Sequence, residues 1–412
     1  MRVPPLWADF THARAYKLNL RKILVTTNPK GISIMVKAIN VLYVYGDKLR
    51  YGGIENCMMN YFRHIDSRVI HIDFAVQGKE IGAFENEILL KGSRIYRLPK
   101  PSMEPIGYVT KMKTIFLSGE YSIVHSHCDA MNSRVLRIAK KCNIPIRISH
   151  SHNTEHVLRS NSIMRTAFYE LSRKSVTKYA TVCYACSREA GLWLYGHHPF
   201  EIIPNAVDIS KFQFNIEMRN KLRTQFEIGE EAIVLGHVGR FDVQKNQKFL
   251  IKVLLALQSL EKKYVLLLIG DGWMRSSIMN FARTLGVDES VIFTGEVEDP
   301  QDYYNMMDLY LMPSLFEGYG IALEEAEING LPCIASNFVP QEANVLNRIK
   351  YLDLKVELWC QEISKYRYPN DYKRFTGAAK EFKRLGYDIQ DAAYRLQEKY
   401  INLYLQAMND HE

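Results

Sequence analysis

Two acidic residues, Glu317 and Glu325, stand eight positions apart in a glycine-containing stretch from Pro313 to Ala326 that leads into a predicted helix. Glycine lets backbone N–H groups approach a ligand closely, and the start of a helix favours an anion such as phosphate. A carboxylate only accepts hydrogen bonds, so a pair of carboxylates suits the hydroxyl groups of a sugar. The spacing therefore predicts a ligand with both phosphate and sugar hydroxyls, and a nucleotide sugar is the obvious candidate.

Two cations follow a predicted buried strand in the second half of the chain. Arg240 comes directly after the strand that ends His-Val-Gly, and Lys245 precedes the next predicted helix. Ligands of open parallel sheets bind beyond the carboxyl ends of the strands. Two fixed positive charges there neutralise a departing diphosphate without a metal ion. We therefore expect a diphosphate site at Arg240 and Lys245, with no metal or other cofactor; two solvated loop charges are the alternative.

Glycine turns end other predicted strands on the same side. Gly295 and Val297 flank a turn whose backbone is placed to bracket a nucleobase, although a plain turn has the same sequence. In the first half, Gly52 and Gly53 open a helix and bring N–H groups towards the cleft from the opposite side. No G-x-G-x-x-G dinucleotide fingerprint occurs in the chain, which argues against a nicotinamide dehydrogenase.

Four histidines end two successive predicted strands as His125, His127, His150 and His152. We expect His150 and His152 to lie on opposite faces if their strand continues, and no Cys or carboxylate set with metal spacing accompanies them. The sequence therefore predicts no metal site. A histidine at the carboxyl end of a strand is better placed to hydrogen-bond a sugar or a transferring oxygen, and a core histidine is the alternative for His125.

The elements that must position these residues alternate between strand and helix, which predicts parallel, doubly wound sheets. Strands are expected at 39–45, 71–76, 94–98, 122–126, 145–150, 180–186 and 201–203, and in a second series at 232–238, 264–269, 291–293, 309–312 and 332–336. Helices are expected at 54–65, 80–91, 106–118, 130–142, 164–178, 187–195, 246–260, 273–285, 300–306 and 321–329. The fold class is α/β, with two Rossmann-like domains facing each other across a cleft.

The series divide the chain into segments. We expect a basic N-terminal extension over 1–34 that is disordered or not native, a first domain over 35–208 that binds the acceptor, and a second over 209–374 that binds the nucleotide sugar. The hinge is placed at 204–230. A C-terminal helical segment over 375–412 is expected to pack across both domains.

Bulk composition excludes several classes. The 412 residues exceed one ordinary core, and no apolar run approaches the roughly 20 residues of a membrane span. No secretory signal is evident, and 7 Cys at scattered spacings indicate reduced thiols in a cytoplasmic protein. Cys183 and Cys186 have a redox or zinc spacing but no second pair, so a buried strand with two thiols is the expectation.

Charge is uneven along the chain. The net charge of +8 divides into +13 for residues 1–210 and −5 for the remainder. A basic half suggests an anionic contact, either nucleic acid or an anionic membrane leaflet. No aromatic-interleaved basic patch supports nucleic acid, so we predict a peripheral position on the inner face of the membrane; general solubility charge is the alternative.

Together these residues resemble the retaining GT-B glycosyltransferases of family 4, especially bacterial capsule and exopolysaccharide enzymes, over most of residues 36–405. The family's Glu-x7-Glu signature within P-S-x-x-E-G-(F/Y)-G is matched from Pro313 to Glu325. Its Gly-Arg…Lys pair is matched by Arg240 and Lys245, and its interdomain Pro-Asn-Gly-Val-Asp by residues 204–208, with Ala in place of Gly. The Gly-Gly-Ile-Glu and His-Ser-His-Asn-Thr runs are also similar to the exopolysaccharide branch.

The resemblance implies roles for these residues. Arg240 and Lys245 would hold the donor diphosphate, with Gly53 and the amides around Tyr319 and Gly320 nearby. Glu325 would accept hydrogen bonds from the ribose, and Glu317 and His150 would act at the donor sugar. Gly52, His127 and His152 would lie on the acceptor or sugar side, and His152 competes with His150 for the donor. Glu324 stands where the family usually has an apolar residue, and a one-residue rotation of the helix would exchange the two glutamates, but the Glu-Ala pair at 325–326 makes Glu325 the better match.

Three functions follow as hypotheses. The leading one is transfer of a sugar, with retention, from a nucleotide-sugar donor such as a UDP-sugar to a lipid-linked or oligosaccharide acceptor in exopolysaccharide or capsule biosynthesis. The leaving phosphate would itself take the acceptor's proton, so no dedicated base is required. The alternatives are a nucleotide-sugar 2-epimerase of the same fold, which turns over without acceptor, and a non-catalytic partner that binds a nucleotide sugar.

Overall fold

The computed structural model describes residues 26–27, 33–34, 38–50, 52–153, 163–260, 263–297, 299–317, 319–366 and 374–409. Most of the predicted extension over 1–34 lies outside these residues, and so do Thr154 and Gly318 of the predicted motifs. Within the extension, β1 (Thr26–Thr27) pairs antiparallel with β2 (Ser33–Ile34).

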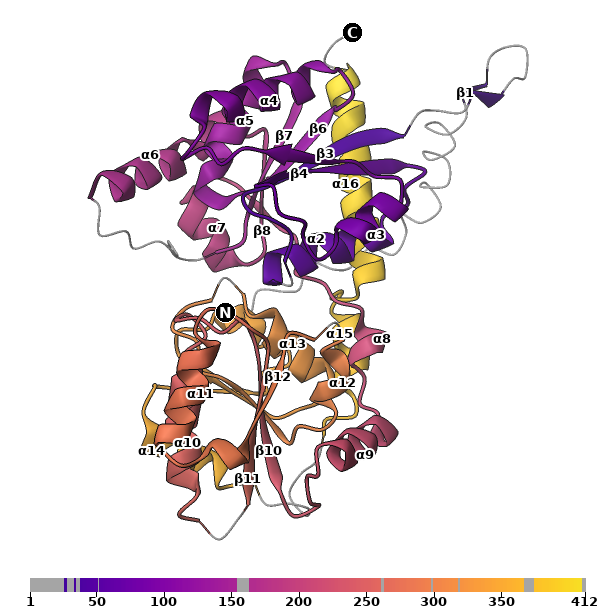
Figure 1. Ribbon diagram of the computed structural model, residues 1–412. Coiled ribbons are helices and arrows are strands. Elements are labelled where there is room, and N and C mark those ends of the chain that lie inside the picture. The colour runs from indigo at the N-terminus through magenta and orange to yellow at the C-terminus, as the bar shows by residue number, and fades with distance from the viewer. Residues whose placement is uncertain are drawn as a thin grey trace.

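Two parallel sheets form two domains, one above the other in Figure 1. The first sheet has the order β5-β4-β3-β6-β7-β8-β9. Its strands are β3 (Ile39–Tyr45), β4 (Ile70–Gln77), β5 (Ile95–Leu98), β6 (Ile123–His127), β7 (Ile146–Ser151), β8 (Val182–Ala185) and β9 (Glu201–Ile202). Its helices are α2 (Gly53–His64), α3 (Glu85–Leu90), α4 (Pro105–Leu117), α5 (Asn132–Lys141), α6 (Ile163–Tyr179) and α7 (Arg188–Tyr195). Cys183 and Cys186 are buried free thiols at β8, as predicted.

The second sheet has the order β12-β11-β10-β13-β14-β15. Its strands are β10 (Ile233–Val238), β11 (Tyr264–Ile269), β12 (Val291–Gly295), β13 (Leu309–Met312), β14 (Cys333–Ser336) and β15 (Ile349–Leu352). Its helices are α10 (Gln247–Leu257), α11 (Arg275–Thr284), α12 (Gln301–Tyr304), α13 (Ile321–Ile328) and α14 (Val356–Ile363). Each sheet is covered on both faces by separate apolar clusters, which is why its strands are nearly continuous in apolar residues. The predicted pair of doubly wound domains is confirmed.

The strand order fixes where a ligand can bind. In each sheet the chain starts at a central strand, builds outward to one side, and then returns to build the other side. The strands on either side of this reversal are β3 and β6 in the first sheet, and β10 and β13 in the second. A crevice opens at such a point because the loops leaving the two strands diverge. The stretches predicted to bind the donor follow β10 and β13.

The predicted hinge over 204–230 is wrong in extent. Two helices occupy most of it, α8 (Ile209–Phe212), capped by Asp208, and α9 (Ile216–Gln225), capped by Asn215. The side-chain oxygens of Asp208 and Asn215 accept N–H groups of the first turn, which satisfies donors that a helix start otherwise leaves unpaired. The connection between the domains is therefore confined to the few residues before Asp208.

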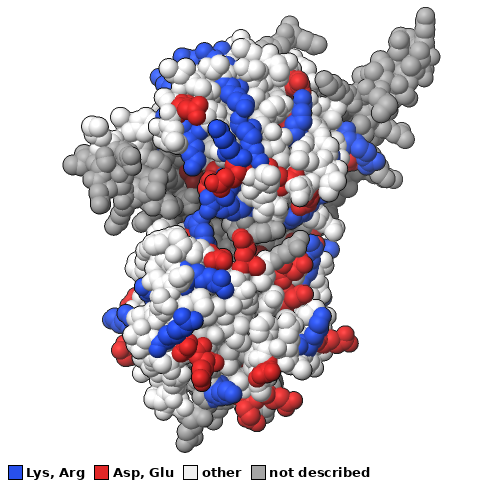
Figure 2. All heavy atoms as spheres, in the orientation of Figure 1, with Lys and Arg blue, Asp and Glu red and all other residues white. Residues whose placement is uncertain are grey.

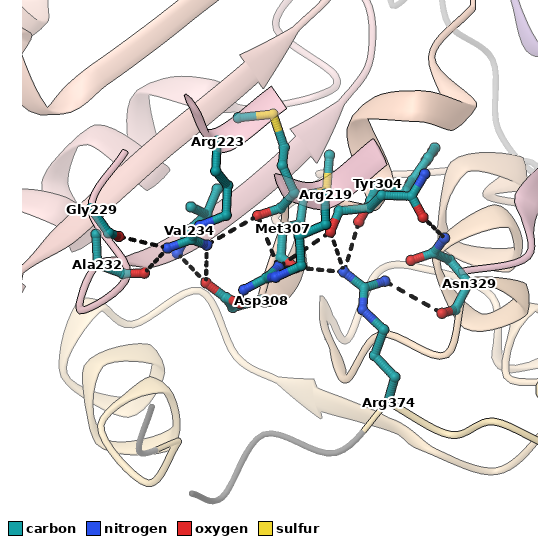
Figure 3. Close-up of polar contacts among 12 residues, drawn as sticks. Arg219, Arg223, Gly229, Ala232, Val234, Tyr304, Met307, Asp308, Asn329 and Arg374 are labelled. Carbon is teal, nitrogen blue, oxygen red and sulfur yellow. Dashed lines mark hydrogen bonds and ion pairs between the residues drawn. The ribbon is translucent and has the colours of Figure 1, made fainter. Parts of the chain in front are cut away.

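A buried charge cluster attaches α9 to the second domain (Figure 3). The Asp308 carboxylate accepts hydrogen bonds from the guanidinium groups of Arg219 at 2.5 Å and Arg223 at 3.2 Å. It also accepts the backbone N–H of Val234 at 2.8 Å. All three charged side chains are at most 7% exposed. Because the pairs are buried and the carboxylate is fully hydrogen-bonded, α9 belongs rigidly to the second domain.

The C-terminal segment returns to the first domain. α15 (Ala378–Arg384) packs on α8 and α13 of the second domain, whereas α16 (Ile389–Asn409) packs on α2 and β7 of the first and lies alongside that domain in Figure 1. Between them the chain pairs with the other connection, because the N–H of Ile389 donates to the Val207 carbonyl at 3.0 Å. Two adjacent backbone segments thus join the domains. No helix among the described residues is long and apolar enough to cross a membrane.

Candidate functional site

A cavity of about 720 Å³ lies between the two domains, where the carboxyl ends of the two sheets face each other. The predicted site residues that line it are Gly52, Gly53, His152, Arg240, Lys245, Val297, Glu317, Tyr319, Gly320 and Glu325. The remaining predicted site residues, His127, His150 and Gly295, do not line it. Most of the predicted site residues thus share one cleft, whereas His127, His150 and Gly295 do not reach its surface.

Lys245 and Glu317 form a buried ion pair on the second-domain wall. The Lys245 Nζ lies 2.6 Å from Glu317 Oε1, and the side chains are 18% and 7% exposed. Gln244 donates to the other carboxylate oxygen, Oε2, at 3.3 Å. Gly239 lies beside them, and a Cβ there would lie 3.2 Å from the Lys245 side chain, so a larger residue would push that side chain aside. The predicted diphosphate cation is therefore held in place by the carboxylate predicted to contact the sugar.

Arg240 is the more accessible cation. Its side chain is 57% exposed, and its Nε donates to Asp242 Oδ2 at 2.8 Å. Asp242 also accepts the backbone N–H of Lys245 at 3.1 Å. One carboxylate therefore orients both the Arg240 side chain and the loop that carries Lys245. The two cations stand on the same wall of the cavity, where their fields add.

The register of the neighbouring glutamates is resolved in favour of Glu325. Glu325 lines the cavity, and its Oε2 accepts the Tyr304 hydroxyl at 2.7 Å. Glu324 is fully buried and does not line the cavity. Adjacent residues of a helix point about 100° apart, so only one of the two can face the cleft. Burial raises the pKa of Glu325 to about 7 and raises that of Glu324 well above its usual range.

The turn before α13 brings backbone to the cavity. Gly320 caps the helix in the left-handed region with φ 104°, which other residues rarely adopt. Tyr319 precedes it and packs on Cys186 and Ala190 of the first domain, so this turn also joins the two domains. The predicted approach of backbone N–H groups at 319–320 therefore has a conformational basis.

The first-domain wall carries a carboxylate that the sequence analysis did not select. Glu55 is buried in the first turn of α2 and lines the cavity, close to Gly52. Burial raises the pKa of Glu55. Hydrogen bonds from the backbone and from Tyr45, together with the charge of Arg240, partly offset that rise. The only sequence signal was a glutamate at the third helical position after two glycines, the position from which a side chain reaches back to its own helix start.

The four histidines form one stack, so the expectation that His150 and His152 lie on opposite faces is wrong. Residues two apart share a face of a strand. The rings of His125 and His127 stack with centroids 4.2 Å apart, and so do those of His150 and His152. Hydrogen bonds join the two pairs, one between His125 Nε2 and His150 Nδ1 at 3.1 Å and one between His127 Nδ1 and His152 Nε2 at 2.8 Å.

Only His152 of this stack reaches the cavity wall. His150 belongs to β7 and lies beneath the surface, whereas His152 is the first residue beyond the strand. The structure therefore favours His152 over His150 as the histidine that faces the ligand. Burial lowers the pKa of His152 to about 3 and those of the other three well below their usual range, so all four are neutral near pH 7.

Ring nitrogens of His125, His127 and His150 lie within 4.8 Å of one another, a spacing at which metal ligands occur. Two of these rings are joined by the hydrogen bond described above, and His125 Nδ1 is bonded to the Tyr400 hydroxyl at 2.6 Å. Bringing both nitrogens of the joined pair onto an ion would require breaking that bond. The hydrogen bond between His125 and His150 and the stacking of His127 on His125 account for the close spacing.

Of the two residues predicted on the nucleobase side, one lines the cavity and the other does not. Val297 lines the cavity, but the Gly295 carbonyl accepts the Gly270 N–H at 2.9 Å. That bond joins the ends of β11 and β12 and keeps Gly295 below the cavity surface. The turn after Gly295, rather than Gly295 itself, faces the ligand space.

Two family models match the chain. The model of "Glycosyltransferase Family 4" matches residues 51–211, and that of "Glycosyl transferases group 1" matches residues 218–349. Among curated relatives, a putative glycosyltransferase EpsF of Bacillus subtilis is 29% identical over 370 residues, which cover 87% of this chain and 96% of the relative. The capsular polysaccharide biosynthesis glycosyltransferase CapH of Staphylococcus aureus is 23% identical and covers 79% of this chain and 90% of the relative.

Solved structures agree in fold. Anabaena HepE, determined with UDP and glucose, superposes with a TM-score of 0.71 at 16% identity and covers 88% of this chain and 99% of its own. A sucrose-phosphate synthase from Thermosynechococcus elongatus gives a TM-score of 0.72 at 16% identity, with coverages of 89% and 100%. At these identities the likeness concerns the fold.

Matched models on both halves, a relative similar over nearly its whole length, and the facing sheets lead to one assignment. The chain belongs to the family 4 glycosyltransferases and has their GT-B fold.

Proposed function

We propose that the protein transfers a sugar from a UDP-sugar to a lipid-linked or oligosaccharide acceptor, with retention of anomeric configuration and without a metal ion, in exopolysaccharide or capsule biosynthesis. One observation carries this proposal. Arg240, Lys245, Glu317 and Glu325 line the same wall of one interdomain cavity. Cations for a diphosphate and carboxylates for hydroxyls are the two groups that a nucleotide sugar requires.

The chemistry follows from where charge develops. Breaking the bond between sugar and diphosphate leaves negative charge on the diphosphate and positive character on the sugar carbon. Lys245 is held by Glu317 before the reaction, so its charge is oriented without further reorganisation. His152 is neutral and offers a hydrogen bond at the opposite wall. The departing phosphate takes the acceptor's proton, and closure about the two backbone connections excludes water.

The names of relatives support the donor and the acceptor. An Escherichia coli relative, 24% identical over 225 residues that cover 53% of this chain and 58% of the relative, is a UDP-Gal:alpha-D-GlcNAc-diphosphoundecaprenol alpha-1,3-galactosyltransferase. HepE was solved with UDP and glucose. Both names include a uridine nucleotide, and the first includes a lipid-linked acceptor.

A peripheral membrane position is part of the proposal. Lys and Arg gather on the first domain in the view of Figure 2, consistent with its net positive charge. On α6, the apolar side chains of Met164, Phe168 and Leu171 are exposed at helical spacing. Lys174 and Lys178 are exposed on the same helix. An apolar stripe with flanking cations suits an anionic bilayer surface.

The test begins with binding. A thermal-shift panel of UDP- and GDP-sugars identifies the donor, because a ligand that binds the folded state raises its apparent stability. The donor is then incubated with and without diphosphoprenyl-linked saccharides, and release of nucleoside diphosphate is measured. Release of nucleoside diphosphate only in the presence of acceptor supports transfer. Turnover of the donor without acceptor supports the epimerase, and donor binding without turnover supports the non-catalytic partner.

Further measurements address the finer parts of the proposal. NMR of the product reports the anomeric configuration, activity in excess EDTA reports metal dependence, and flotation with anionic vesicles at low and high salt reports membrane contact. Lys245→Met should reduce acceptor-dependent release of nucleoside diphosphate by about 10²–10³. Lys248→Met, at the same helix start but with its ammonium over the Phe281 ring, should not. Full activity of Lys245→Met would refute the site.

A further inference from the structure

Tyr304, whose hydroxyl donates to Glu325, lies behind the cavity wall and does not itself line the cavity. Tyr304 is fully buried at the end of α12, and its hydroxyl lies 2.7 Å from Glu325 Oε2 and 3.2 Å from the Ala322 carbonyl. A phenol has one proton to donate. The shorter contact, to a carboxylate, takes that proton, because a hydrogen bond to an ionised acceptor is the stronger one.

The ring of Tyr304 is fixed from several sides. Phe212 of α8 and Tyr310 of β13 each place a ring centroid 5.8 Å from it. Its own carbonyl accepts Arg374 Nη2 at 3.0 Å, and the same nitrogen also bonds the Met307 carbonyl at 2.7 Å (Figure 3). The phenol is therefore held at both ends, by packed rings and by a clamped backbone.

We infer that Tyr304 is a positioning residue for the donor site: its hydroxyl fixes the Glu325 carboxylate and leaves the second oxygen for the ribose hydroxyls of the nucleotide. The inference rests on the proposed function, because it assigns Glu325 to the ribose. It explains why a partly exposed carboxylate at a cavity wall should need a buried hydroxyl behind it. Without that hydroxyl the carboxylate is free to rotate, and two rotatable bonds must be ordered at each binding event.

The same contact controls the charge of Glu325. Burial raises the pKa of Glu325 to about 7, and the Tyr304 hydroxyl and then the Lys245 charge counteract that rise. The other titrating groups that interact with this carboxyl are Glu324 next to it on α13 and the buried Tyr310 of β13. An ionised carboxylate accepts from both ribose hydroxyls, so donor binding should strengthen as pH rises through about 7. Removing the Tyr304 hydroxyl should move that transition to higher pH.

The experiment compares Tyr304→Phe with wild type and with Tyr303→Phe, a matched control on the same helix. Titration calorimetry measures the Kd of UDP and of 2′,3′-dideoxy-UDP from pH 6 to 9. Wild type should prefer UDP, with a transition near pH 7. In Tyr304→Phe we expect roughly tenfold weaker UDP binding at pH 7.5, a smaller preference over the dideoxy nucleotide, and a transition at higher pH. Tyr303→Phe should match wild type.

Failure of the proposed function and failure of the inferred role of Tyr304 give different results. If wild type binds no nucleoside diphosphate, GDP included, the proposed function fails. If wild type binds UDP with a preference and pH profile that Tyr304→Phe leaves unchanged, the role of Tyr304 is refuted. Should Tyr304→Phe not fold, Glu325→Gln is measured instead: loss of the pH transition with a weakened ribose preference supports the assignment, and a persistent transition overturns it.

Discussion

Replacing Glu324 by glutamine should stabilise the protein increasingly as pH rises. Glu324 is fully buried on α13, and neither carboxyl oxygen has hydrogen-bond geometry with another described residue, although the Tyr319 hydroxyl lies beside it. Burial therefore raises the pKa of Glu324 far above its usual value of 4.5. The folded protein holds this proton over a pH range in which the unfolded chain has lost it. Stability thus falls as pH rises above about 4.5.

The size of the effect follows from the proton alone. Each pH unit above the ordinary pKa costs about 1.4 kcal/mol, so keeping this carboxyl protonated at pH 7 costs at most about 3.4 kcal/mol. Glutamine has nearly the same shape and does not titrate. Glu324→Gln should therefore gain up to about 3 kcal/mol over wild type at pH 7 and almost nothing near pH 4.

Urea denaturation at pH 5, 6, 7 and 8, followed by tryptophan fluorescence, measures the difference between the two proteins. The control is Glu381→Gln, because Glu381 lies exposed beside Arg384 and its pKa is lowered. The control should show no gain that grows with pH. A difference between Glu324→Gln and wild type that stays constant from pH 5 to 8 would show that Glu324 is ionised in the folded protein, and the reasoning from burial would be wrong.

The other predictions concern stability and the cleft. Asp308→Asn should destabilise the second domain by about 3–5 kcal/mol, because it leaves the buried Arg219 without its full countercharge; a urea midpoint within error of wild type would contradict this. His152→Ala should lower kcat/KM about tenfold through one lost hydrogen bond, whereas His150→Ala should mainly lower the melting temperature. Steady-state kinetics and thermal denaturation of both variants distinguish the two effects. Lys245→Met should reduce kcat/KM by about 10²–10³. This factor should be larger than any change in the Kd of the acceptor, measured separately.

The sequence was informative wherever one local rule decided the structure. Apolar runs of strand length alternate with helical patterns, and this alternation predicted the parallel sheets because each strand is buried on both faces. The carboxyl end of a parallel strand is also known once its direction is known. Arg240, Lys245 and Glu325 could therefore be assigned to one cleft before any distance was available.

Predictions were wrong or missing where contacts between segments distant in sequence determine the structure. The polar composition of 204–230 indicated a hinge, yet Arg219 and Arg223 bury their charges on Asp308 about ninety positions away, a pairing that no local pattern reveals. The Glu-x7-Glu spacing favoured Glu325 over its neighbour Glu324, whereas the hydroxyl of Tyr304 that fixes the Glu325 carboxylate could be identified only in three dimensions. β15 and α14 went unpredicted because the polar loops around them interrupt the alternating pattern.

The prediction for the four histidines was wrong for a different reason, because the alternation rule was applied with the wrong period. Applied correctly, it places His125 with His127 and His150 with His152 on the same side of β6 and β7. The register of the two strands, which pairs Ser126 with Ser149, then brings the two pairs side by side. The same-face placement was thus available from the sequence, whereas the choice between His150 and His152 needed the cavity.

The charges of the cavity suggest how a donor would be admitted. Lys245 is paired with Glu317, and Arg240 is paired with Asp242 and lies in the field of Glu55 from the opposite domain. A diphosphate entering the cavity must therefore compete with these carboxylates for the same cations. Each carboxylate that it displaces becomes an acceptor for hydroxyl groups, which the sugar of the same ligand carries. A bare diphosphate would displace the carboxylates without supplying those donors, so the arrangement favours a nucleotide that still carries its sugar over the nucleoside diphosphate that leaves.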